Sequence, residues 1–270
     1  MDLLLQNKVA FVAGASSGLG RAVALRLAEE GCQVAMCSRS QERIDRAADA
    51  IREEAGADEA DVHPLVCDVT DEHSIKAAID ATVERFGKLN VLVTNAGGPP
   101  SGKIEEFSAD DWRRALELNL MSTINLCAAG RPHLEEAAST DGHARIIMVS
   151  SVSAKQPLAS LPLSNTSRAG VQGFAKSLSR ELGASGITVN TVLPGYTKTD
   201  RLNELSAKIQ EEENIDAEEV EARWAEQNAV KRLGRPEEFA ATVAFLASEP
   251  AAYITGVALP VDGGRSKHLL

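Results

Sequence analysis

The chain has 270 residues, of which 44% are hydrophobic and 25% are charged, an ordinary mixture for a globular protein with a large core. A formal net charge of -11 disfavours nucleic-acid binding, because a polyanion would be repelled over most of the surface. No apolar run approaches the roughly 20 residues that span a bilayer, and the leucines after Asp2 lack a signal peptide's basic flank, so we expect a cytoplasmic protein without membrane contact.

Short β-branched segments alternate with longer amphipathic segments along the chain. This pattern predicts one α/β domain over residues 1–270, of the Rossmann type, with a doubly wound, seven-stranded, mainly parallel sheet and helices on both faces. The expected strands are Lys8 to Ala13, Gln33 to Cys37, Val62 to Val66, Leu89 to Thr94, Arg145 to Ser150, Thr188 to Leu193 and Val257 to Pro260. The expected helices are Leu19 to Glu30, Gln41 to Glu54, Glu72 to Phe86, Ala109 to Ala129, Ala169 to Leu182 and Pro236 to Ala247.

Two local features refine this prediction. Ser108 and Asp111 have the spacing of a capping box at the start of a helix. The acidic segment at about 200–228 predicts a helical insertion, which is either a lid over a site or a solvated helical pair. Periodicity alone does not separate these two alternatives.

A glycine-rich segment, GASSGLG, lies between the first expected strand and the first expected helix. At such a junction backbone N–H groups approach a pyrophosphate, and the helix N-terminus contributes partial positive charge. We therefore predict a dinucleotide site. Its first contacts are Gly14, Ser16, Ser17, Gly18, Leu19 and Gly20.

The residues at the end of the second expected strand, Ser38 and Arg39, bear on the choice of cofactor. An acidic residue there would bind the adenosine ribose and select NAD. With no carboxylate present and a guanidinium that can bind a 2'-phosphate in a bidentate manner, the sequence favours NADP(H) over NAD(H). The alternative is that Arg39 only begins the following helix and stacks on adenine.

Several ordered motifs resemble those of the short-chain dehydrogenase/reductase family. They are GASSGLG, Asn95-Ala96-Gly97, Pro194-Gly195 followed by Thr199, and Val261 to Gly264, so the resemblance spans nearly the whole chain. It implies hydride transfer between a nicotinamide and a carbonyl or alcohol substrate, and a homo-oligomer, dimer or tetramer. The further cofactor contacts that it implies are Asp68, Val69, Asn95, Ala96, Gly97, Pro194, Gly195, Thr197 and Thr199.

The family's catalytic residues are an Asn, a Ser, a Tyr and a Lys, and two of these match. Asn119 corresponds to the asparagine and Ser151 to the serine, whereas the tyrosine and lysine positions hold Ser164 and Arg168. A similar Leu-Ser-Asn-x-x-Arg segment is found in a divergent branch of the family that resembles 3-oxoacyl-acyl-carrier-protein reductases. Arg168 is expected to keep the lysine's contact with the nicotinamide ribose, because its guanidinium can bond the ribose hydroxyls.

The serine at the tyrosine position changes the expected proton delivery. A phenol titrates near 10, whereas an aliphatic alcohol is far less acidic. Three hypotheses follow. In the first, the protein is a reductase in which the proton arrives through Ser164, water and Asn119 while Ser151 polarises the carbonyl. In the second, it is a reductase in which Tyr196 supplies the proton, and in the third it is a nucleotide-binding protein without redox chemistry. We favour the first, because Asn119 and Ser151 are present, although Asn119 could instead satisfy a helix bend and Ser151 could cap a strand.

The expected substrate pocket lies among Gly97 to Pro100, Lys155 to Leu163 and the acidic insertion. Its prolines and leucines predict a rigid apolar lining, which is typical of a small-molecule site. The acidic residues Glu211 to Glu221 disfavour an acidic carrier protein if they lie at the entrance. No metal site is expected. The cysteines, expected to be reduced and partly buried, are Cys32, Cys37, Cys67 and Cys127; the histidines, expected at the surface, are His63, His73, His133, His143 and His268.

Overall fold

The computed structural model describes residues 1–59 and 61–269, in which seven strands form one sheet. The strand order is β3-β2-β1-β4-β5-β6-β7, and every pairing is parallel. The strands are β1 (Val9–Val12), β2 (Gln33–Ser38), β3 (Val62–Val66), β4 (Val91–Thr94), β5 (Ala144–Val149), β6 (Ile187–Pro194) and β7 (Ala258–Val261). The predicted Rossmann-type α/β fold is confirmed, and among the described strands the sheet is wholly parallel.

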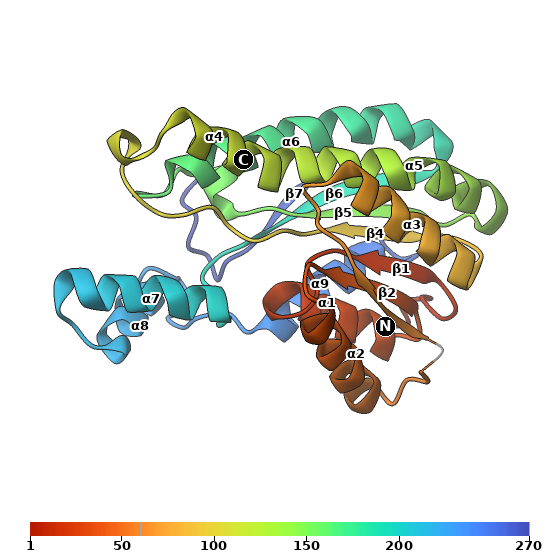
Figure 1. The fold of residues 1–270 in the computed structure, drawn as a ribbon, viewed down its shortest axis with the longest axis horizontal. Coiled ribbons are helices and arrows are strands. Elements are labelled where there is room, and N and C mark those ends of the chain that lie inside the picture. Colours follow the sequence, from red (N-terminus) through yellow and green to blue (C-terminus); the bar gives the residue numbers. More distant parts are fainter. Residues whose placement is uncertain (60, 270) are drawn as a thin grey trace.

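Helices connect the strands and cover both faces of the sheet (Figure 1). The α-helices are α1 (Gly18–Glu29), α2 (Gln41–Ala55), α3 (Glu72–Phe86), α4 (Ala109–Leu116), α5 (Ser122–Asp141), α6 (Pro162–Leu182), α7 (Asp200–Glu213), α8 (Ala217–Glu226) and α9 (Pro236–Ala247). The short helical turns are η1 (Ile104–Glu106), η2 (Glu117–Met121), η3 (Val152–Ala154) and η4 (Gly183–Ser185).

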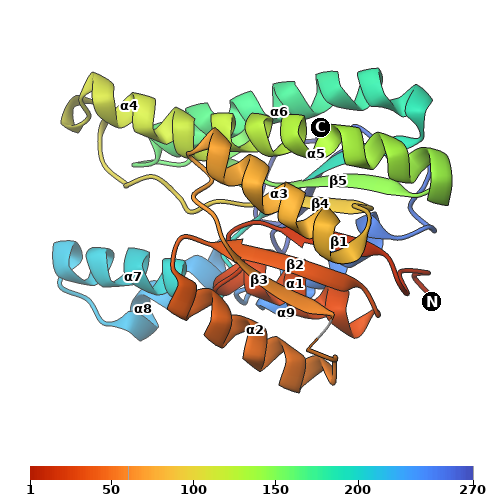
Figure 2. The same ribbon diagram turned by 45° about the vertical axis from the view of Figure 1, so that its right-hand side comes forward.

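The sheet separates two hydrophobic layers. Helices α1, α2 and α9 pack on one face, and α3, α5 and α6 pack on the other (Figure 2). Successive residues of a strand point to opposite faces, so in β1 Ala10 and Val12 belong to the first layer while Phe11 belongs to the second. Because both faces are covered at the centre of the sheet, β1 and β4 are buried at every position.

The order of the strands determines where a ligand can bind. β1 pairs with β2 on one side and with β4 on the other, so successive connections leave the sheet in opposite directions at this point. In open α/β sheets of this kind, the crevice lies beyond the carboxyl ends of the strands at the reversal. The turns that follow β1 and β4 therefore form the centre of the site.

The helix expected over residues 109–129 is divided in two. α4 ends at Leu116, a π-helical turn occupies Glu117–Met121, and α5 continues to Asp141. The wider turn accompanies a buried Asn119, whose amide nitrogen donates to the backbone oxygen of Gly97 over 2.8 Å. Such π-helical turns occur frequently at functional sites.

The helix expected from Ala169 begins earlier than predicted, at Pro162. A proline is favourable in the first turn of a helix, because its missing N–H has no intrahelical partner there. Ser164 and Arg168 consequently lie on the first two turns of α6, whose fixed geometry positions them relative to β5.

The capping box predicted at Ser108 and Asp111 is confirmed. The Ser108 hydroxyl accepts from the Asp111 backbone N–H, and the Asp111 carboxylate accepts from the Ser108 N–H. The predicted helical acidic segment is confirmed as α7 and α8, which pack around Leu202, Val220 and Trp224.

Within the described residues, none of the helices is long and apolar enough to cross a bilayer. The four cysteines are free and buried, as expected for reduced thiols. The described part of the chain contains no cluster of side chains that could hold a metal ion.

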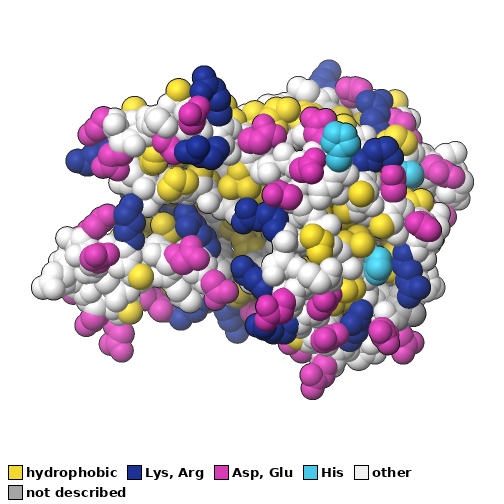
Figure 3. Space-filling model, in the orientation of Figure 1, with side chains coloured by type: hydrophobic (Ala, Val, Ile, Leu, Met, Phe, Trp, Pro, Cys, Tyr) yellow, Lys and Arg dark blue, Asp and Glu magenta, His cyan; other side chains and the backbone are white. Residues whose placement is uncertain are grey.

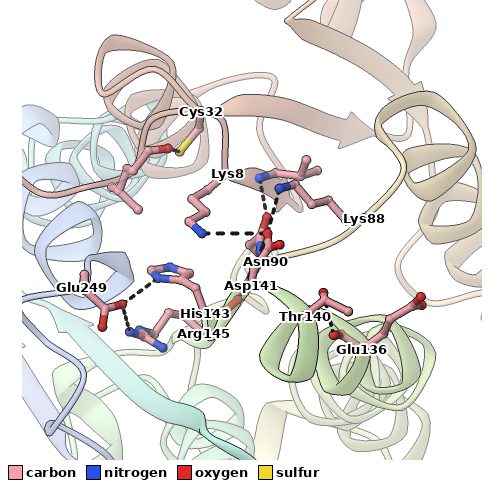
Figure 4. A network of polar contacts seen from close by, with 12 residues as sticks. Lys8, Cys32, Lys88, Asn90, Glu136, Thr140, Asp141, His143, Arg145 and Glu249 are labelled. Carbon is pink, nitrogen blue, oxygen red and sulfur yellow. Dashed lines mark hydrogen bonds and ion pairs between the residues drawn. The ribbon is translucent and has the colours of Figure 1, made fainter.

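The prediction that each histidine lies at the surface is wrong for His143, which is 2% exposed. Figure 4 shows it in a polar network at the amino-terminal ends of the strands, where its Nδ1 lies 3.1 Å from a Glu249 carboxylate oxygen. The same oxygen accepts from buried Arg145 over 3.1 Å. Polar partners in the folded chain thus stabilise residues whose types are usually exposed.

We expect the protein to lose stability in mild acid because of His143. Burial, assisted by the charge of Arg145, lowers the pKa of its imidazole despite the opposing effect of Glu249. The unfolded chain therefore binds a proton at a pH where the folded chain does not, so the free energy of unfolding falls as the pH drops below about 6.5. Urea unfolding between pH 5 and 8 measures how steeply the free energy of unfolding depends on pH. His143→Gln should reduce this dependence, whereas the control His73→Gln, at an exposed site, should preserve it. Equal pH dependence in the two variants would refute the role of His143.

Candidate active site

One cavity of about 840 Å³ extends from the turn after β1 to the start of α7. It lies beyond the carboxyl ends of the strands, and Figure 3 shows Lys and Arg side chains around the corresponding hollow. The predicted cofactor residues that line it are Gly14, Ser16, Ser17, Gly18, Leu19, Ser38, Arg39, Asp68, Val69, Asn95, Ala96, Gly97, Arg168, Pro194, Gly195, Thr197 and Thr199. The structure thus brings together residues that are far apart in the sequence.

The glycine-rich turn is held close to α1 and to the turn after β4. Gly14 has a φ of +60°, and a Cβ atom on Gly20 would lie 2.3 Å from the Gly14 backbone oxygen. The Asn95 amide donates to the backbone oxygens of Ala13 and Gly14 over 3.2 and 3.1 Å. Gly20 therefore contributes by its lack of a side chain and is outside the cavity lining, whereas Asn95 lines the cavity and braces the turn.

Two arginines lie at the end of the cavity next to β2. Arg39, which was predicted, is followed by Arg43 in the first turn of α2, and both line the cavity. Asp68 lines the same region, and hydrogen bonds from Thr70, with a contribution from the charge of Arg39, lower the pKa of its carboxyl group. This end can bind a phosphate through two guanidinium groups and a ribose or adenine through a carboxylate.

Arg43 was not identified from the sequence, because an arginine in an amphipathic helix usually indicates only a solvated face. Its position four residues after Arg39 was the available signal. On the same helix, exposed Arg46 forms an ion pair with Glu42 and does not line the cavity.

Ser151 and Ser164 both line the β5 side of the cavity, and Ser153 makes a hydrogen bond with each of them. The Ser151 hydroxyl oxygen accepts from the backbone N–H of Ser153 over 3.1 Å, and the hydroxyls of Ser153 and Ser164 are 3.4 Å apart. Ser151 follows β5 directly and Ser164 lies in the first turn of α6, so a strand end and a helix fix their separation. Both residues line the same cavity as the glycine-rich turn.

Arg168 is a buried cation at the same end of the cavity, with 7% of its surface exposed. Its guanidinium donates to the Val149 backbone oxygen over 2.9 Å and, at longer distances, to those of Ala96 and Gly97. Burial lowers the pKa of this side chain to about 10. The group remains charged at neutral pH, so it presents a desolvated positive charge to any ligand in the cavity.

Asn119 does not line the cavity, in contrast to the other three predicted catalytic residues. It is fully buried; its amide nitrogen donates to Gly97, its amide oxygen accepts from Ser167 over 3.2 Å, and its backbone oxygen accepts from Thr123. Asn119 thereby ties the π-helical turn to the turn after β4 and to α6. These bonds occupy both ends of its side-chain amide.

Tyr196, the alternative proton source, lines the cavity but is engaged by its neighbours. Its ring stacks on Trp224 at 4.9 Å, and the Arg265 guanidinium lies 4.0 Å from the ring centre while donating to its hydroxyl over 2.9 Å. Burial raises the pKa of the phenol, although the charge of Arg265 opposes this effect. These contacts link the segment before α7 to α8, through Trp224, and to the segment after β7, through Arg265.

Helix α7 extends over the cavity on the substrate side. Thr199 caps its start, Leu202 and Leu205 line the cavity, and Arg201 donates to the Pro99 backbone oxygen over 2.9 Å. None of the described acidic residues between Glu211 and Glu221 belongs to the cavity lining. The expected repulsion of an acidic carrier protein therefore has no support from the cavity itself.

The residues at the cavity fit a dinucleotide cofactor. The turn before α1 leaves no space for side chains at Gly14 and Gly20, the Ser17 hydroxyl makes no capping bond, and the Nε of Arg168 is buried without a hydrogen-bond partner among the described residues. Helix α1 directs its N-terminus at the same place, where a pyrophosphate would be stabilised.

The chain is similar to known proteins over nearly its whole length. The family described as Enoyl-(Acyl carrier protein) reductase matches residues 14–266. The 3-oxoacyl-[acyl-carrier-protein] reductase FabG of Vibrio cholerae is 36% identical over 260 residues, which cover 96% of this chain and 98% of that protein. The structure of L-sorbose reductase from Gluconobacter frateurii, complexed with NADPH and L-sorbose, is 31% identical and covers 100% of both chains with a TM-score of 0.92.

A second solved structure is also similar over nearly the whole chain. The apo structure of a short-chain oxidoreductase from Pseudomonas aeruginosa PAO1, described as containing an atypical catalytic center, is 34% identical with a TM-score of 0.86, over 97% of this chain and 98% of that one. The fold, the ordered motifs and these similarities agree over nearly the whole length. The chain belongs to the short-chain dehydrogenase/reductase family.

Proposed function

We propose that the protein is an NADP(H)-dependent oxidoreductase that transfers hydride between the nicotinamide and a carbonyl or alcohol group of a small molecule. The observation that carries this proposal is one cavity that joins the glycine-rich turn and Arg39 to Ser151, Ser164 and Arg168. A bound cofactor would supply the hydride. The NADPH complex of L-sorbose reductase supports the choice of nucleotide.

Each end of the cavity has a distinct role in this proposal. The turn before α1 binds the pyrophosphate, and Arg39 with Arg43 binds the 2'-phosphate. Arg168 bonds the nicotinamide ribose, while the hydroxyls of Ser151 and Ser164 donate to the substrate oxygen. Because the Asn119 amide is occupied by Gly97 and Ser167, we assign this residue to positioning the loop and α6 rather than to a proton relay.

Helix α7 acts as a cover in this proposal, since it lines the cavity and bonds the loop after β4 through Arg201. We also propose a homo-oligomer. Exposed Tyr253, Val257 and Leu259 lie on or beside β7, the edge strand of the sheet, where a second copy could bury them.

The proton route is tested by comparing Ser164→Ala with Tyr196→Phe. We expect Ser164→Ala to lower the rate of NADPH oxidation about tenfold, because a hydrogen bond that strengthens in the transition state contributes roughly 1–3 kcal/mol. Tyr196→Phe should leave the rate unchanged, since burial raises the pKa of the phenol and makes it a weaker acid. Stopped-flow oxidation of NADPH with a panel of ketones and quinones measures both rates.

The opposite pattern, with activity lost only in Tyr196→Phe, would assign the proton to the phenol. Tight NADPH binding by the unmodified protein without turnover of any carbonyl compound would leave a nucleotide-binding protein instead of an enzyme. Failure to bind either NADPH or NADH would overturn the proposal as a whole.

A further inference from the structure

The cavity lining is cationic, although the chain as a whole has a formal net charge of -11. Among the described residues it contains five arginines and two aspartates, one at the β2 end and one at the exposed start of α7. The proposed function assigns two of these arginines to the 2'-phosphate and one to the nicotinamide ribose. A fourth, Arg201, forms an ion pair with Glu204 over 3.0 Å. These assignments leave Arg265 without a role.

Arg265 follows β7 and forms no ion pair with the described part of the chain. Its Nη2 donates to the Tyr196 hydroxyl over 2.9 Å and to the Gln227 side-chain oxygen over 3.2 Å, and both acceptors are neutral. Its Nη1 has no hydrogen-bond partner among the described residues, and its Nε is buried without one. The carboxylate of Asp262, in the same segment, accepts instead from two backbone N–H groups. A partly buried cation without a counter-ion is costly, and an anionic ligand offsets that cost.

Tyr196 supplies a second hydrogen-bond donor beside this cation. The Arg265 guanidinium lies 4.0 Å from the centre of the Tyr196 ring, and stacking on Trp224 fixes the ring. Because the Tyr196 oxygen accepts from Arg265, its own proton is available to another acceptor. Burial raises the pKa of the phenol, so the hydroxyl keeps this proton at neutral pH. The two oxygens of a carboxylate match the phenol O–H and the Nη1 of Arg265.

Arg265 and Tyr196 line the same cavity as Ser151 and Ser164. The Lys267 N–H donates to the Gln156 side chain over 2.8 Å, which joins the segment after β7 to the loop that follows β5. An apolar part of the lining is formed by Leu158, Leu161, Leu202 and Leu205. A substrate with a carbonyl group at the serines and an anionic group at Arg265 would therefore place an apolar chain against leucines.

We propose that the substrate is a carbonyl or alcohol compound that carries a carboxylate at the end of an apolar chain, and that Arg265 and Tyr196 bind this carboxylate. The inference rests on the proposed hydride transfer and names its substrate class. The carboxylate accepts from the Arg265 Nη1 and from the Tyr196 hydroxyl, while the carbonyl oxygen accepts from Ser151 and Ser164. Arg265 and Tyr196 select the substrate and take no part in the transfer of hydride or proton.

Oxo acids and their methyl esters, which differ in the charge at one end, test the inference. With the unmodified protein and NADPH, the pairs are 4-oxopentanoate, 5-oxohexanoate and 7-oxooctanoate, each with its ester. For at least one chain length we expect kcat/KM to be at least about tenfold higher for the acid, a difference of roughly 1.4 kcal/mol in barrier. The difference should appear mainly in KM, because the carboxylate contact is the same in the ground state and the transition state.

A smaller preference for the acid at every chain length would overturn the inference and leave the proposed function intact. Turnover of neutral ketones without turnover of any oxo acid would have the same meaning. Failure of the acids, the esters and the neutral ketones alike to oxidise bound NADPH would overturn the inference and the proposed function together.

Arg265→Gln is expected to remove the preference for the acid. KM for the preferred acid should rise about tenfold, whereas KM for its uncharged ester should change by less than about twofold. Tyr196→Phe should raise KM for the acid by a smaller factor and leave the ester unaffected. The control Arg223→Gln removes the same charge from an exposed residue of α8 that pairs with Glu219 outside the cavity lining, so the preference should stay.

Two results with a folded Arg265→Gln variant would overturn the inference. One is a preference for the acid that remains, and the other is an equal loss for acid and ester, which would show that Arg265 only supports the fold. Thermal unfolding checks that the variant is folded.

Calorimetric titration with hexanoate and hexanamide measures binding without turnover and without any variant. The unmodified protein is first saturated with NADP+, so that the arginines assigned to the cofactor are occupied. Hexanoate should bind at least about tenfold more tightly than hexanamide, because only the acid carries the charge that Arg265 lacks. Equal affinities would overturn the inference, including the case in which Arg265→Gln does not fold.

Discussion

Replacing Arg39 and Arg43 together by alanine is expected to weaken NADPH binding about 100-fold and to leave NADH binding nearly unchanged. Both guanidinium groups line the β2 end of the cavity, where the adenosine 2'-phosphate of NADPH would lie. A hydrogen bond to a charged group contributes roughly 1.5–3 kcal/mol, and every 1.4 kcal/mol corresponds to a factor of ten in affinity. Fluorescence titration with each nucleotide measures the two dissociation constants.

A matched control for this double variant is Arg46→Ala on the same helix. Arg46 is exposed, is paired with Glu42 and lies outside the cavity lining, so its removal changes the net charge without removing a phosphate ligand. The affinity for NADPH should stay within a few fold. A similar loss of affinity for NADPH and NADH in the double variant, or tighter binding of NADH by the unmodified protein, would refute the assigned 2'-phosphate site.

Gly20→Ala is expected to destabilise the fold and to weaken NADPH binding at least tenfold. The new Cβ would lie 2.3 Å from the Gly14 backbone oxygen, and neither backbone can rotate away as a side chain would. Overpacking typically lowers the free energy of unfolding by about 1–3 kcal/mol. The new methyl group would also push α1 away from the turn, which moves the N–H groups that would bind the pyrophosphate. Urea unfolding and nucleotide titration measure the two effects.

Gly173→Ala is the matched control for the substitution at Gly20. Gly173 lies within α6, and a Cβ built there meets no atom within 4 Å. Alanine should stabilise this helix by about 0.5–1 kcal/mol, because glycine loses more conformational freedom on folding. Equal effects of the two substitutions would show that close packing between α1 and the turn is not what requires Gly20.

Local sequence patterns predicted much of the site, because its cofactor-binding part is built from strand ends. The turn after β1 and Asn95 to Gly97 after β4 are short segments, each attached to a predictable strand. Once the strands are known to be parallel and adjacent, the turns must meet at one edge of the sheet. The predicted cofactor residues other than Gly20 line the cavity for this reason.

Side-chain partners from distant segments were not predictable in the same way. The sequence left open whether Asn119 is catalytic or satisfies a helix bend, and it did not predict that the Asn119 amide binds Gly97 and Ser167. His143 was expected at the surface, yet it is buried beside Glu249. Arg43 and Arg265 were overlooked as cavity residues, since their types and spacings are common on solvated surfaces. The partners of Asn119 and His143 come from distant segments, and the distance along the sequence carries no signal for such contacts.

The sequence by itself determined the parallel α/β fold, the position of the glycine-rich turn, and the replacement of the family's tyrosine and lysine by Ser164 and Arg168. These features are expressed by apolar periodicity, by backbone conformations that need glycine, and by residue identity, all of which are local. Only the tertiary structure decided that Arg168 is a buried cation bonded to neutral backbone oxygens, and that Tyr196 is held by Arg265 and Trp224. Burial and hydrogen-bond partners determine the protonation state and the orientation of a side chain, and both exist only once the chain has folded.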